Sequence, residues 1–321
     1  MTPQLKLSVV STLYRSSGTV DEFVERAAAS ARALVGDSFE IVLVNDGSPD
    51  DSLERAEALL ASLPELVLVD LSRNFGHHVA LLEGLRQSAG KLVYLIDSDL
   101  EEHPEWVSSF RDVLLREKSD VVFGFQEKRK GGFLERVSGA VYWSTFRRLS
   151  GLDIPANVVT CRLMTRRYVD ALMLHGEREV SIGALFAVAG FRQVGLPVTK
   201  DHKGSSTYSL RLKIWHLVNS ISAFSTKPLS GIFLMGVFVS GIGFVLLVYL
   251  VVVGLLWSRS PAGWTSVMAS VWLLGGLVLS SLGVIAIYLG KVFSEVKARP
   301  RSIVRSVTRS RDRLSPEAAA D

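Results

Sequence analysis

The stretch FEIVLVNDGSPDDSLERAEALLASLPELVLVDL, residues 39–71, contains an apolar run, a polar turn, an amphipathic segment and a second apolar run. The two runs, 39–44 and 66–71, are almost continuously apolar, which is typical of strands buried on both faces of a sheet. The amphipathic segment between them, 50–63, has the length of a helix. This order of strand, helix and strand predicts two parallel strands joined by a crossover helix.

The same alternation extends over the first 130 residues. Further strands are predicted at 5–13, 91–96 and 120–125, and further helices at 20–35 and 77–89. Such alternation predicts an α/β fold with a Rossmann-like, mostly parallel sheet covered by helices on both faces. Neither G-x-G-x-x-G nor G-x-x-x-x-G-K-S/T occurs at the turns. The chain is therefore not expected to be a dinucleotide-binding protein or a P-loop protein.

Polar residues follow four of the predicted strands. They are Tyr14 and Arg15, then Asn45 to Ser48, then Arg73, Asn74 and Gly76, and finally Asp97 and Asp99. Any one set could be ordinary turn chemistry, and Ser48 or Asp50 could simply cap the next helix. Ligands of parallel sheets bind beyond the carboxyl ends of the strands, so four sets at one edge favour a binding site.

The segment YLIDSDLEEHPEW, residues 94–106, concentrates five carboxylates in a chain whose formal net charge is +4. Asp97 and Asp99 are two residues apart, so in an extended segment their side chains point to the same side. Such a pair can hold Mg²⁺ or Mn²⁺ and leave positions for water and substrate phosphates. Glu102 and Glu105 are interpreted as first-turn acids of the following helix, whose dipole favours them. His103, like His77 and His78, is interpreted as a residue at a helix start.

Two long stretches, 229–257 and 260–290, contain no charged residue, in a chain that is 48% hydrophobic. Each exceeds the roughly 20 residues that a helix needs to cross about 30 Å of hydrocarbon. We therefore predict a two-helix transmembrane hairpin within 229–293, with helices at about 229–257 and 265–290. Helices buried inside a soluble protein are the alternative.

The distribution of basic residues predicts how such a hairpin is oriented. Basic residues precede the first stretch and follow the second, whereas the connection holds only Arg259. The positive-inside rule then puts the N-terminal domain and both termini in the cytosol, at an inner or plasma membrane. No N-terminal apolar stretch resembles a signal peptide. The single cysteine, Cys161, fits a reducing compartment and is interpreted as a core residue.

Two segments beside the predicted hairpin have more than one interpretation. Residues 209–228 combine apolar residues at helical spacing with Lys213, Trp215 and Lys227, which favours an interfacial amphipathic helix over a packed connector. The basic tail, 294–321, could bind nucleic acid or anionic lipid headgroups. Its place beside a membrane helix favours lipid, and no nucleic-acid partner is expected.

An ordered series of motifs covers residues 5–307: LYRSSGTVDEF, FEIVLVNDGSPDDS, LSRNFGHHVALLEGL, YLIDSDLEEHPE, FGFQEKRKGG, CRLMTRRYVDAL, KGSSTYSLR and, after the hairpin, VKARPRSIV. The series resembles the polyprenyl-phosphate glycosyltransferases of glycosyltransferase family 2, such as dolichyl-phosphate mannose synthases, bactoprenol glucosyltransferases and the undecaprenyl-phosphate formamido-arabinose transferase. The resemblance implies a GT-A domain over residues 1–208. It also implies inverting transfer of a sugar from a nucleoside-diphosphate sugar to undecaprenyl or dolichyl monophosphate, for cell-envelope glycans or lipid modification.

The resemblance also implies residue roles. Tyr14 and Asp46 resemble residues that hold the nucleotide, Asp97 resembles the D-x-D member nearest the nucleotide sugar, and Asp99 resembles the metal ligand. Arg129 and Lys130 resemble basic residues that approach phosphate, and Gly204, Ser206 and Tyr208 match the family's G-x-S-K-Y segment. Lys200 and Lys203 are further candidates for the acceptor phosphate, with a solvated or lipid-facing surface as the alternative. The family also implies assembly through the membrane helices, for example as a tetramer.

Some positions depart from the family pattern. Glu101 replaces the glutamine of D-x-D-L-Q and could add a metal ligand, Thr207 replaces the G-x-S-K-Y lysine, and Asn157 and Thr160 stand where relatives have aspartates. Those last two changes leave the identity of a catalytic base open. A lipid monophosphate has a second pKa of about 6 and is already largely anionic at cytosolic pH, so proton removal is not essential.

The sequence offers two alternatives to this function. The departures at Asn157 and Thr160 would suit a non-catalytic subunit that binds nucleotide sugars, although the retained Asp97 and Asp99 argue against it. A processive polysaccharide synthase would carry a Q-x-x-R-W motif and more membrane helices. The motifs are shared by enzymes that use different sugars, uridine or guanosine donors and different polyprenols.

Overall fold

The computed structural model describes residues 5–127, 157–176, 182–201, 226–257 and 263–310, together with Ser144 and Arg148. The described chain divides into two units. The first holds residues 5–127, 157–201 and 299–310, with the gap at 177–181, and the second holds two long helices between residues 226 and 298.

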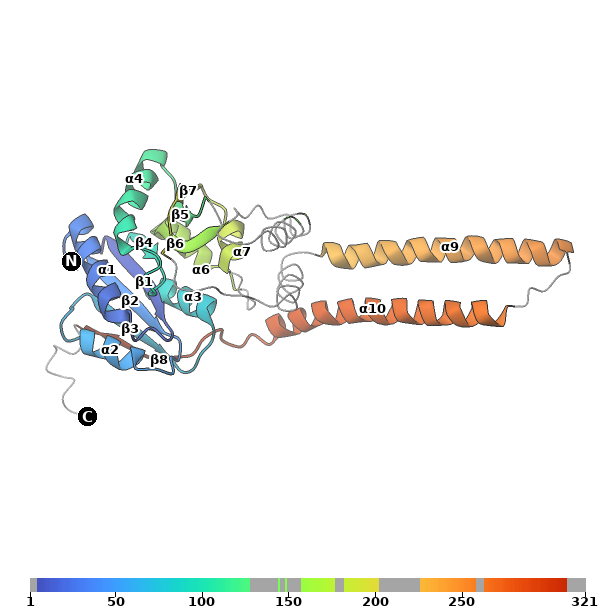
Figure 1. Cartoon of the computed structure of the whole chain (residues 1–321), viewed down its shortest axis with the longest axis horizontal. Coiled ribbons are helices and arrows are strands. Elements are labelled where there is room, and N and C mark those ends of the chain that lie inside the picture. Colours follow the sequence, from blue (N-terminus) through green and yellow to red (C-terminus); the bar gives the residue numbers. More distant parts are fainter. Residues whose placement is uncertain are drawn as a thin grey trace. The chain divides into compact units, whose positions relative to one another are not determined.

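The first unit contains the α/β pattern expected from the sequence (Figure 1). Its first half runs β1 (Leu7–Leu13), α1 (Val20–Val35), β2 (Phe39–Asn45), α2 (Ser52–Leu59), β3 (Leu66–Leu71), α3 (His77–Gln87) and β4 (Leu92–Leu95). It continues with the short helix η1 (Pro104–Trp106), α4 (Val107–Glu117), β5 (Val121–Phe125), β6 (Val158–Thr165), α6 (Arg166–Met173), α7 (Ile182–Val188) and β7 (Gln193–Pro197). The five predicted strands and three predicted helices are confirmed.

Within the described residues, eight strands form one sheet in the order β7-β5-β6-β4-β1-β2-β3-β8. The centre is parallel, with β1 between β4 and β2, and β2 next to β3. Strand β6 runs antiparallel to both β4 and β5, so the sheet is mixed although mostly parallel. This is the GT-A-like arrangement that the sequence predicted.

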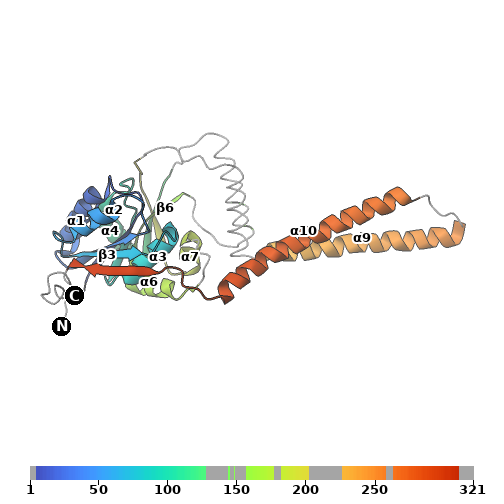
Figure 2. The same cartoon turned by 90° about the horizontal axis from the view of Figure 1, so that it is seen from below.

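Two apolar layers pack on the faces of the sheet because successive strand residues point to opposite sides. Val9 belongs to the layer with α1 and α4, whereas its neighbour Val10 belongs to the layer with α3, α6 and α7 (Figure 2). All seven residues of β1 are buried, and so are all seven of β2. With both faces covered, the open positions of the sheet are the strand ends.

The last strand, β8 (Val304–Arg309), comes from the basic segment that the sequence placed in a cytosolic tail. It pairs antiparallel with β3, with Val67 opposite Arg309 and Leu71 opposite Val304. Edge strands carry unpaired N–H and C=O groups, and β8 supplies partners for those of β3. Residues 304–309 are therefore part of the sheet of the first unit.

The second unit consists of α9 (Lys227–Trp257) and α10 (Trp264–Val296), which contact each other. Both are longer than the roughly 20 residues of a membrane span. Within the described residues, Leu273–Val296 is long and apolar enough to cross a membrane, and Lys227–Gly243 in α9 is a shorter apolar stretch. Most of the predicted interfacial segment, 209–225, lies outside the described residues.

Candidate active site

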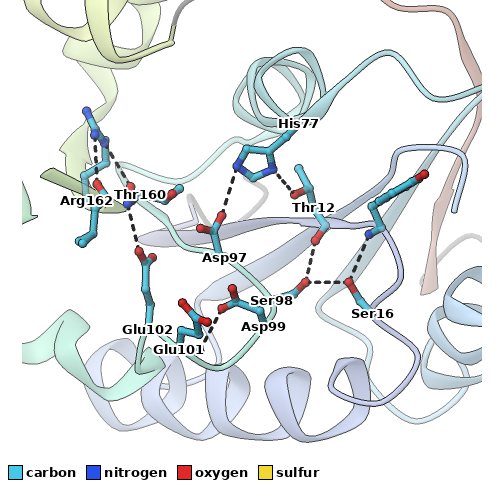
Figure 3. Close-up of polar contacts among 12 residues, drawn as sticks. Thr12, Ser16, His77, Asp97, Ser98, Asp99, Glu101, Glu102, Thr160 and Arg162 are labelled. Atoms are coloured by element: carbon cyan, nitrogen blue, oxygen red, sulfur yellow. Dashed lines mark hydrogen bonds and ion pairs between the residues drawn. The ribbon is translucent and has the colours of Figure 1, made fainter. Parts of the chain in front are cut away.

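The loops that follow β1, β2, β3 and β4 meet at one edge of the sheet. The backbone N–H of Arg15 donates to Ser48 Oγ at 2.7 Å, which joins the first loop to the second. Ser98 Oγ donates to the carbonyl oxygen of Thr12 at 2.7 Å, which joins the fourth loop to the first (Figure 3). The four polar sets picked out in the sequence thus lie together, as predicted.

Asp46 connects the second loop to the third. It is buried, and its two carboxylate oxygens accept the backbone N–H groups of Phe75 at 2.7 Å and Gly76 at 3.0 Å. Burial raises the pKa of Asp46, and the two N–H donors oppose that shift. The side chain predicted to hold nucleotide therefore also fixes the loop that begins α3.

Gly47 lets these two loops touch. Its φ is +58°, and a Cβ at this position would lie 2.5 Å from the backbone nitrogen of Asn74 and 2.6 Å from the carbonyl carbon of Arg73. Glycine is the residue that adopts this conformation freely and leaves room for a second backbone. The N-D-G-S segment therefore forms a turn and also packs against the loop that follows β3.

Tyr14 presents an open aromatic ring at this edge. Its side chain is 45% exposed, and the guanidinium carbon of Arg15 lies 5.7 Å from the ring centroid. The loop beneath it is fixed, because Ser16 Oγ accepts the N–H of Tyr14 at 3.2 Å and Ser52 Oγ accepts the N–H of Ser16 at 2.9 Å. An exposed ring on a fixed loop is suited to stacking against a planar base.

Asp97 and Asp99 follow β4 with the buried Ser98 between them. Asp97 Oδ1 is buried and accepts no hydrogen bond from the described residues, although His77 Nε2 lies 3.4 Å away. The other ring nitrogen of His77 is 3.1 Å from Thr12 Oγ1 (Figure 3). His77 opens α3, as predicted, and the contact of its ring with Asp97 was not foreseen.

Asp99 is exposed, and its Oδ1 accepts the backbone N–H of Glu101 at 2.9 Å. Among the described residues, no three His, Cys, Asp or Glu side chains are gathered closely enough to form a complete metal site. The buried oxygen of Asp97 without a hydrogen bond is nevertheless what a cation ligand requires, and Asp99 leaves the same loop beside it. These two carboxylates therefore fit a divalent ion that is completed by water and substrate.

Glu102 is the largest departure from the sequence interpretation. Its side chain is 0% exposed, Oε1 accepts the backbone N–H of Thr160 at 3.0 Å, and Oε2 has no hydrogen-bond partner among the described residues. Burial and the nearby charge of Asp97 raise the pKa of Glu102 to about 7. Glu102 is thus a buried site residue, and the interpretation as a helix-start acid is wrong. Glu105 does lie in the first turn, where Arg26 contacts it at 2.8 Å.

The turn at Leu100 explains why Glu102 points inward. Leu100 has φ +63°, a left-handed conformation that is costly for a residue with a branched side chain, and it is buried in the core. Burial of its apolar side chain offsets that cost. The reversal leaves Asp99 exposed and turns the chain so that Glu102 enters the protein.

Lys200, just after β7, is the cation beside these acids. Its Nζ is 3.3 Å from Glu102 Oε1 and 3.5 Å from Glu101 Oε2. Burial opposes its charge, but the carboxylates of Glu102, Asp97 and Asp99 outweigh burial and raise the pKa of Lys200. The N–H of Asp201 also donates to the carbonyl oxygen of Glu101 at 3.0 Å, so the segment after β7 is held against the acidic loop.

Arg162 in β6 is a site neighbour that the sequence did not single out. It is buried, its guanidinium carbon lies 3.5 Å from the ring centroid of Phe186, and its Nε donates to the carbonyl oxygen of Thr160 at 3.3 Å. Burial lowers the pKa of Arg162 to about 10. A basic residue inside an apolar strand, as in CRLM, is the sequence signal that could have revealed it.

Several other residues have simpler places. His103 precedes η1 and packs edge-on against Trp106 with ring centroids 4.9 Å apart, as expected for a helix start, and Cys161 is fully buried in the core. The remaining candidates for phosphate and acceptor binding lie outside the described residues: Arg129, Lys130, Lys203, Gly204, Ser206 and Tyr208.

Comparison with known proteins gives a consistent family. Residues 8–173 match the family described as "Glycosyl transferase family 2". A Mycobacterium tuberculosis protein described as a glycosyltransferase is 42% identical over 303 residues, 94% of this chain and 88% of the relative. The undecaprenyl-phosphate 4-deoxy-4-formamido-L-arabinose transferase of Pseudomonas paraeruginosa is 30% identical, over 97% of this chain and 93% of its own.

A prophage-derived bactoprenol glucosyl transferase of Shigella flexneri is 29% identical over 94% of this chain and 98% of its own. Among solved structures, the glucosyl-3-phosphoglycerate synthase of M. tuberculosis is 20% identical, covers 69% of this chain and 80% of its own, and gives a TM-score of 0.46. The family match spans more than half of the chain and includes the loops after β1, β2, β3 and β4. The chain is therefore a glycosyltransferase and belongs to glycosyltransferase family 2.

Proposed function

We propose that the protein is a membrane-anchored, inverting glycosyltransferase that moves a sugar from a nucleoside-diphosphate sugar to a polyprenyl monophosphate. One observation carries the proposal: relatives named for bactoprenol and undecaprenyl phosphate align over 94% and 97% of this chain. Alignment of that length includes α9 and α10 as well as the sheet. A lipid acceptor lies in the membrane, so two long apolar helices would hold the family 2 domain close to it.

In this proposal the donor binds at the ends of β1 and β2. The exposed ring of Tyr14 stacks on the base, and Asp46 receives hydrogen bonds from the nucleoside. Each Asp46 oxygen accepts one backbone N–H and has a second lone pair for a ligand. Fixed loops reduce the ordering cost of binding.

A divalent ion, Mg²⁺ or Mn²⁺, is part of the same proposal. Asp97 and Asp99 would hold it, with Glu101 as a further ligand. Bound there, the ion would supply positive charge to the diphosphate that leaves the sugar. The buried Asp97 oxygen without a hydrogen bond supports this assignment.

The chemistry needs little from a general base. An oxygen of the lipid phosphate attacks the anomeric carbon as the bond from that carbon to the nucleoside diphosphate breaks, and the configuration inverts. The lipid phosphate, with a second pKa of about 6, is already anionic, so in-line placement and charge compensation provide the catalysis. Lys200, Arg129, Lys130 and Lys203, with Ser206 and Tyr208, are proposed to hold the acceptor.

The proposed membrane arrangement follows the sequence. Helices at about 229–257 and 265–290 cross the membrane, residues 209–228 lie at its interface, and residues 1–208 and 294–321 are cytosolic. Assembly into oligomers through the two helices completes the proposal. The segment Leu273–Val296 supports at least one crossing.

The activity is tested with membranes that contain the protein, undecaprenyl phosphate, Mg²⁺ or Mn²⁺ and a panel of labelled nucleotide sugars. The mass of the extracted lipid product identifies the sugar. The expected result is one lipid-linked sugar, formed at least about 100-fold more slowly by membranes of the Asp99→Asn variant. The proposal fails if no donor yields a lipid product while the Shigella flexneri bactoprenol glucosyl transferase does so in the same assay.

A further inference from the structure

Strand β8 is held to the sheet at both of its ends by side chains as well as by its backbone pairing. Before the strand, Ser302 Oγ donates to Glu83 Oε2 at 2.9 Å. After it, the buried Ser310 Oγ donates to the carbonyl oxygen of Leu60 at 2.6 Å. The strand pairs with β3, whose carboxyl end enters the candidate site, and the register shifts between Asp70 and Leu71, so that Ser306 lies opposite Asp70, Val304 lies opposite Leu71, and Arg305 is the extra residue between them. The C-terminal chain thus reaches the edge of the sheet next to the donor loops.

Arg305 in β8 compensates a buried acid in β3. Its guanidinium donates to Asp70 Oδ2 at 2.9 Å and, through its other terminal nitrogen, to the carbonyl oxygen of Ser72 at 2.9 Å. The Asp70 side chain is 7% exposed, and a buried carboxylate is costly unless it is paired and hydrogen-bonded. Two matched donor contacts fix the end of β3 relative to β8.

The other carboxylate oxygen of Asp70 accepts a hydrogen bond from Asn45 in β2. Asn45 Nδ2 donates to Asp70 Oδ1 at 2.7 Å, and Asn45 Oδ1 accepts the N–H of Ser48 at 3.1 Å. The amide nitrogen of Asn45 therefore donates to an acceptor and its amide oxygen accepts from a donor. These two hydrogen bonds fix the orientation of the Asn45 side chain. Asn45 is the last residue of β2 and directly precedes Asp46.

Ser48 links the loop after β2 to the loop after β1 by hydrogen bonds. Its Oγ accepts the N–H of Arg15 at 2.7 Å and donates to Asp50 Oδ1 at 2.5 Å. Asp50 Oδ2 accepts the N–H of Ser17 at 3.2 Å. An unbroken series of hydrogen bonds therefore runs from Arg305 through Asp70, Asn45 and Ser48 to the loop that bears Tyr14.

We propose that Arg305 is a positioning residue for the donor site: the strand that follows α10 holds Asp70, and Asp70 orients Asn45 so that the loops of Tyr14 and Asp46 keep the conformation that binds the nucleotide. The identity of the ligand rests on the proposed function. The coupling itself rests on the contacts above, which do not involve the membrane helices or the acceptor.

Arg309 provides a matched control on the same strand. Its Nη1 atom is 3.8 Å from Glu40 Oε2, so Arg309 also pairs with a buried acid. Glu40, however, contacts Ser8 Oγ and the N–H of Ala89, which lie at the opposite end of the sheet from the donor loops. Loss of either arginine weakens β8, and only loss of Arg305 breaks the series to Tyr14.

The experiment compares full-length Arg305→Gln, Arg305→Lys and Arg309→Gln in lipid nanodiscs. Hydrogen–deuterium exchange is measured for peptides covering 13–19 and 45–52, and donor KM, acceptor KM and kcat are measured with the donor found in the panel. For Arg305→Gln we expect faster exchange in both peptides and a donor KM raised about tenfold, the effect of losing roughly one charged hydrogen bond. Acceptor KM and kcat should stay within about twofold, a change of roughly 0.4 kcal/mol.

The conservative variant separates positioning from folding. A lysine side chain in place of Arg305 would be able to reach Asp70 but not Ser72 at the same time, so Arg305→Lys should lie between wild type and Arg305→Gln. If Arg305→Gln does not fold, the double variant Asp70→Asn with Arg305→Gln removes the uncompensated charge and is measured in its place. It too should show faster exchange in 13–19 than Arg309→Gln, because the arginine contact with Ser72 is still missing.

The outcomes are separable. Equal exchange and equal donor KM in the Arg305 and Arg309 variants would overturn the inference. If wild type binds no nucleotide sugar, the proposed function fails, and the exchange of 13–19 and 45–52 still decides whether Arg305 orders these loops. Faster exchange confined to peptides of β3 and β8 would assign Arg305 an edge-strand role only, which also overturns the inference.

Discussion

Glu101 and Glu102 are adjacent and chemically identical, yet the structure gives them different environments. The left-handed turn at Leu100 leaves Glu102 without solvent exposure, beside Lys200 and the N–H of Thr160. A carboxylate without water is destabilised in its charged form, so the pKa of Glu102 rises to about 7. At the residue scale, the burial of Glu102 and the nearby charge of Asp97 place the pKa of this one side chain near neutral pH.

This difference predicts how stability depends on pH. Between about pH 4.5 and 7 the folded protein keeps the proton of Glu102 that the unfolded chain releases, so stability falls as pH rises through this window. Glu102→Gln cannot ionise, and its melting temperature in metal-free buffer should fall less than that of wild type between pH 5 and 7.

Glu105→Gln is the matched control for that measurement. Arg26 lowers the pKa of Glu105, so the stabilisation by Glu105 is present above its ordinary pKa and is lost as pH falls. Glu105→Gln should therefore keep the wild-type slope between pH 5 and 7 and should lose less stability than wild type only below about pH 4.5. Parallel profiles for Glu102→Gln and wild type would show that Glu102 has an ordinary pKa.

The acidic pair gives a second prediction at this scale. Asp99→Asn keeps the size of the side chain and removes the charge that a divalent ion needs, so product formation should fall by about 100-fold or more. Because Asp99 is exposed, the melting temperature should stay close to wild type. Wild-type rates in this variant, measured as lipid-linked sugar, would remove Asp99 from the proposed metal site.

At the scale of the elements, the ends of β1 to β4 are joined by contacts that the local sequence predicts only in part. The loops after β2 and β3 touch at Gly47, and Ser98 ties the end of β4 to Thr12 at the end of β1. Parallel strands bring their carboxyl ends to one edge, so loops from separate βα units become neighbours. The candidate site is therefore a property of several element ends and not of any one motif.

Gly47→Ala tests the contact between the β2 and β3 loops. A Cβ at this position would lie 2.5 Å from backbone, so the loops must separate, and we expect a loss of about 2–3 kcal/mol of unfolding free energy together with weaker donor binding. Gly36→Ala is the control, since Gly36 has a similar φ of +64° and nothing within 4 Å of its Cβ position. With ψ −148° the backbone of Gly36 is in a region that is almost exclusive to glycine, so Gly36→Ala should cost roughly 1–3 kcal/mol through backbone strain and leave donor binding at the wild-type value. Wild-type donor binding in Gly47→Ala would mean that the contact does not support these loops.

At the scale of the whole molecule, a sheet domain built from residues on both sides of a helix pair carries the catalytic loops. Strand β8 lies after α10 in the sequence and yet completes the sheet beside β3. After α9 and α10 the chain therefore returns to the unit that holds the sheet. In the proposed function that return keeps both ends of the helix pair on the cytosolic side.

Accessibility labelling tests this topology. In a Cys161→Ser background, Arg259→Cys should react with a membrane-impermeant maleimide added to intact cells, because it lies in the predicted external connection. Ser315→Cys should react only after the membrane is opened. Labelling of both positions in intact cells, or of neither, would contradict a hairpin with cytosolic ends. The native Cys161 is fully buried, so its removal simplifies the background.

Much of the fold and half of the site were predictable because they depend on local patterns. Apolar runs such as 39–44 and 66–71 defined the strands, and the polar residues after them, from Tyr14 to Asp99, marked the site edge. Strand β8 was not predictable. Its short alternating pattern is interrupted by arginines that also suit a membrane-proximal tail, and pairing with β3 joins residues 235 positions apart.

The sequence by itself determined the alternation of strands and helices, the positions of the polar loops and the resemblance to a glycosyltransferase family, because periodicity and motif order are local properties. Only the tertiary structure decided that Glu102 is buried beside Lys200, that Arg162 contacts Thr160, and that Arg305 supports Asp70. The physical reason is that burial and charge pairing depend on which distant segments share a sheet. A carboxylate has the same formula in either setting, and its neighbours in space decide whether it caps a helix, holds a proton or orders a loop.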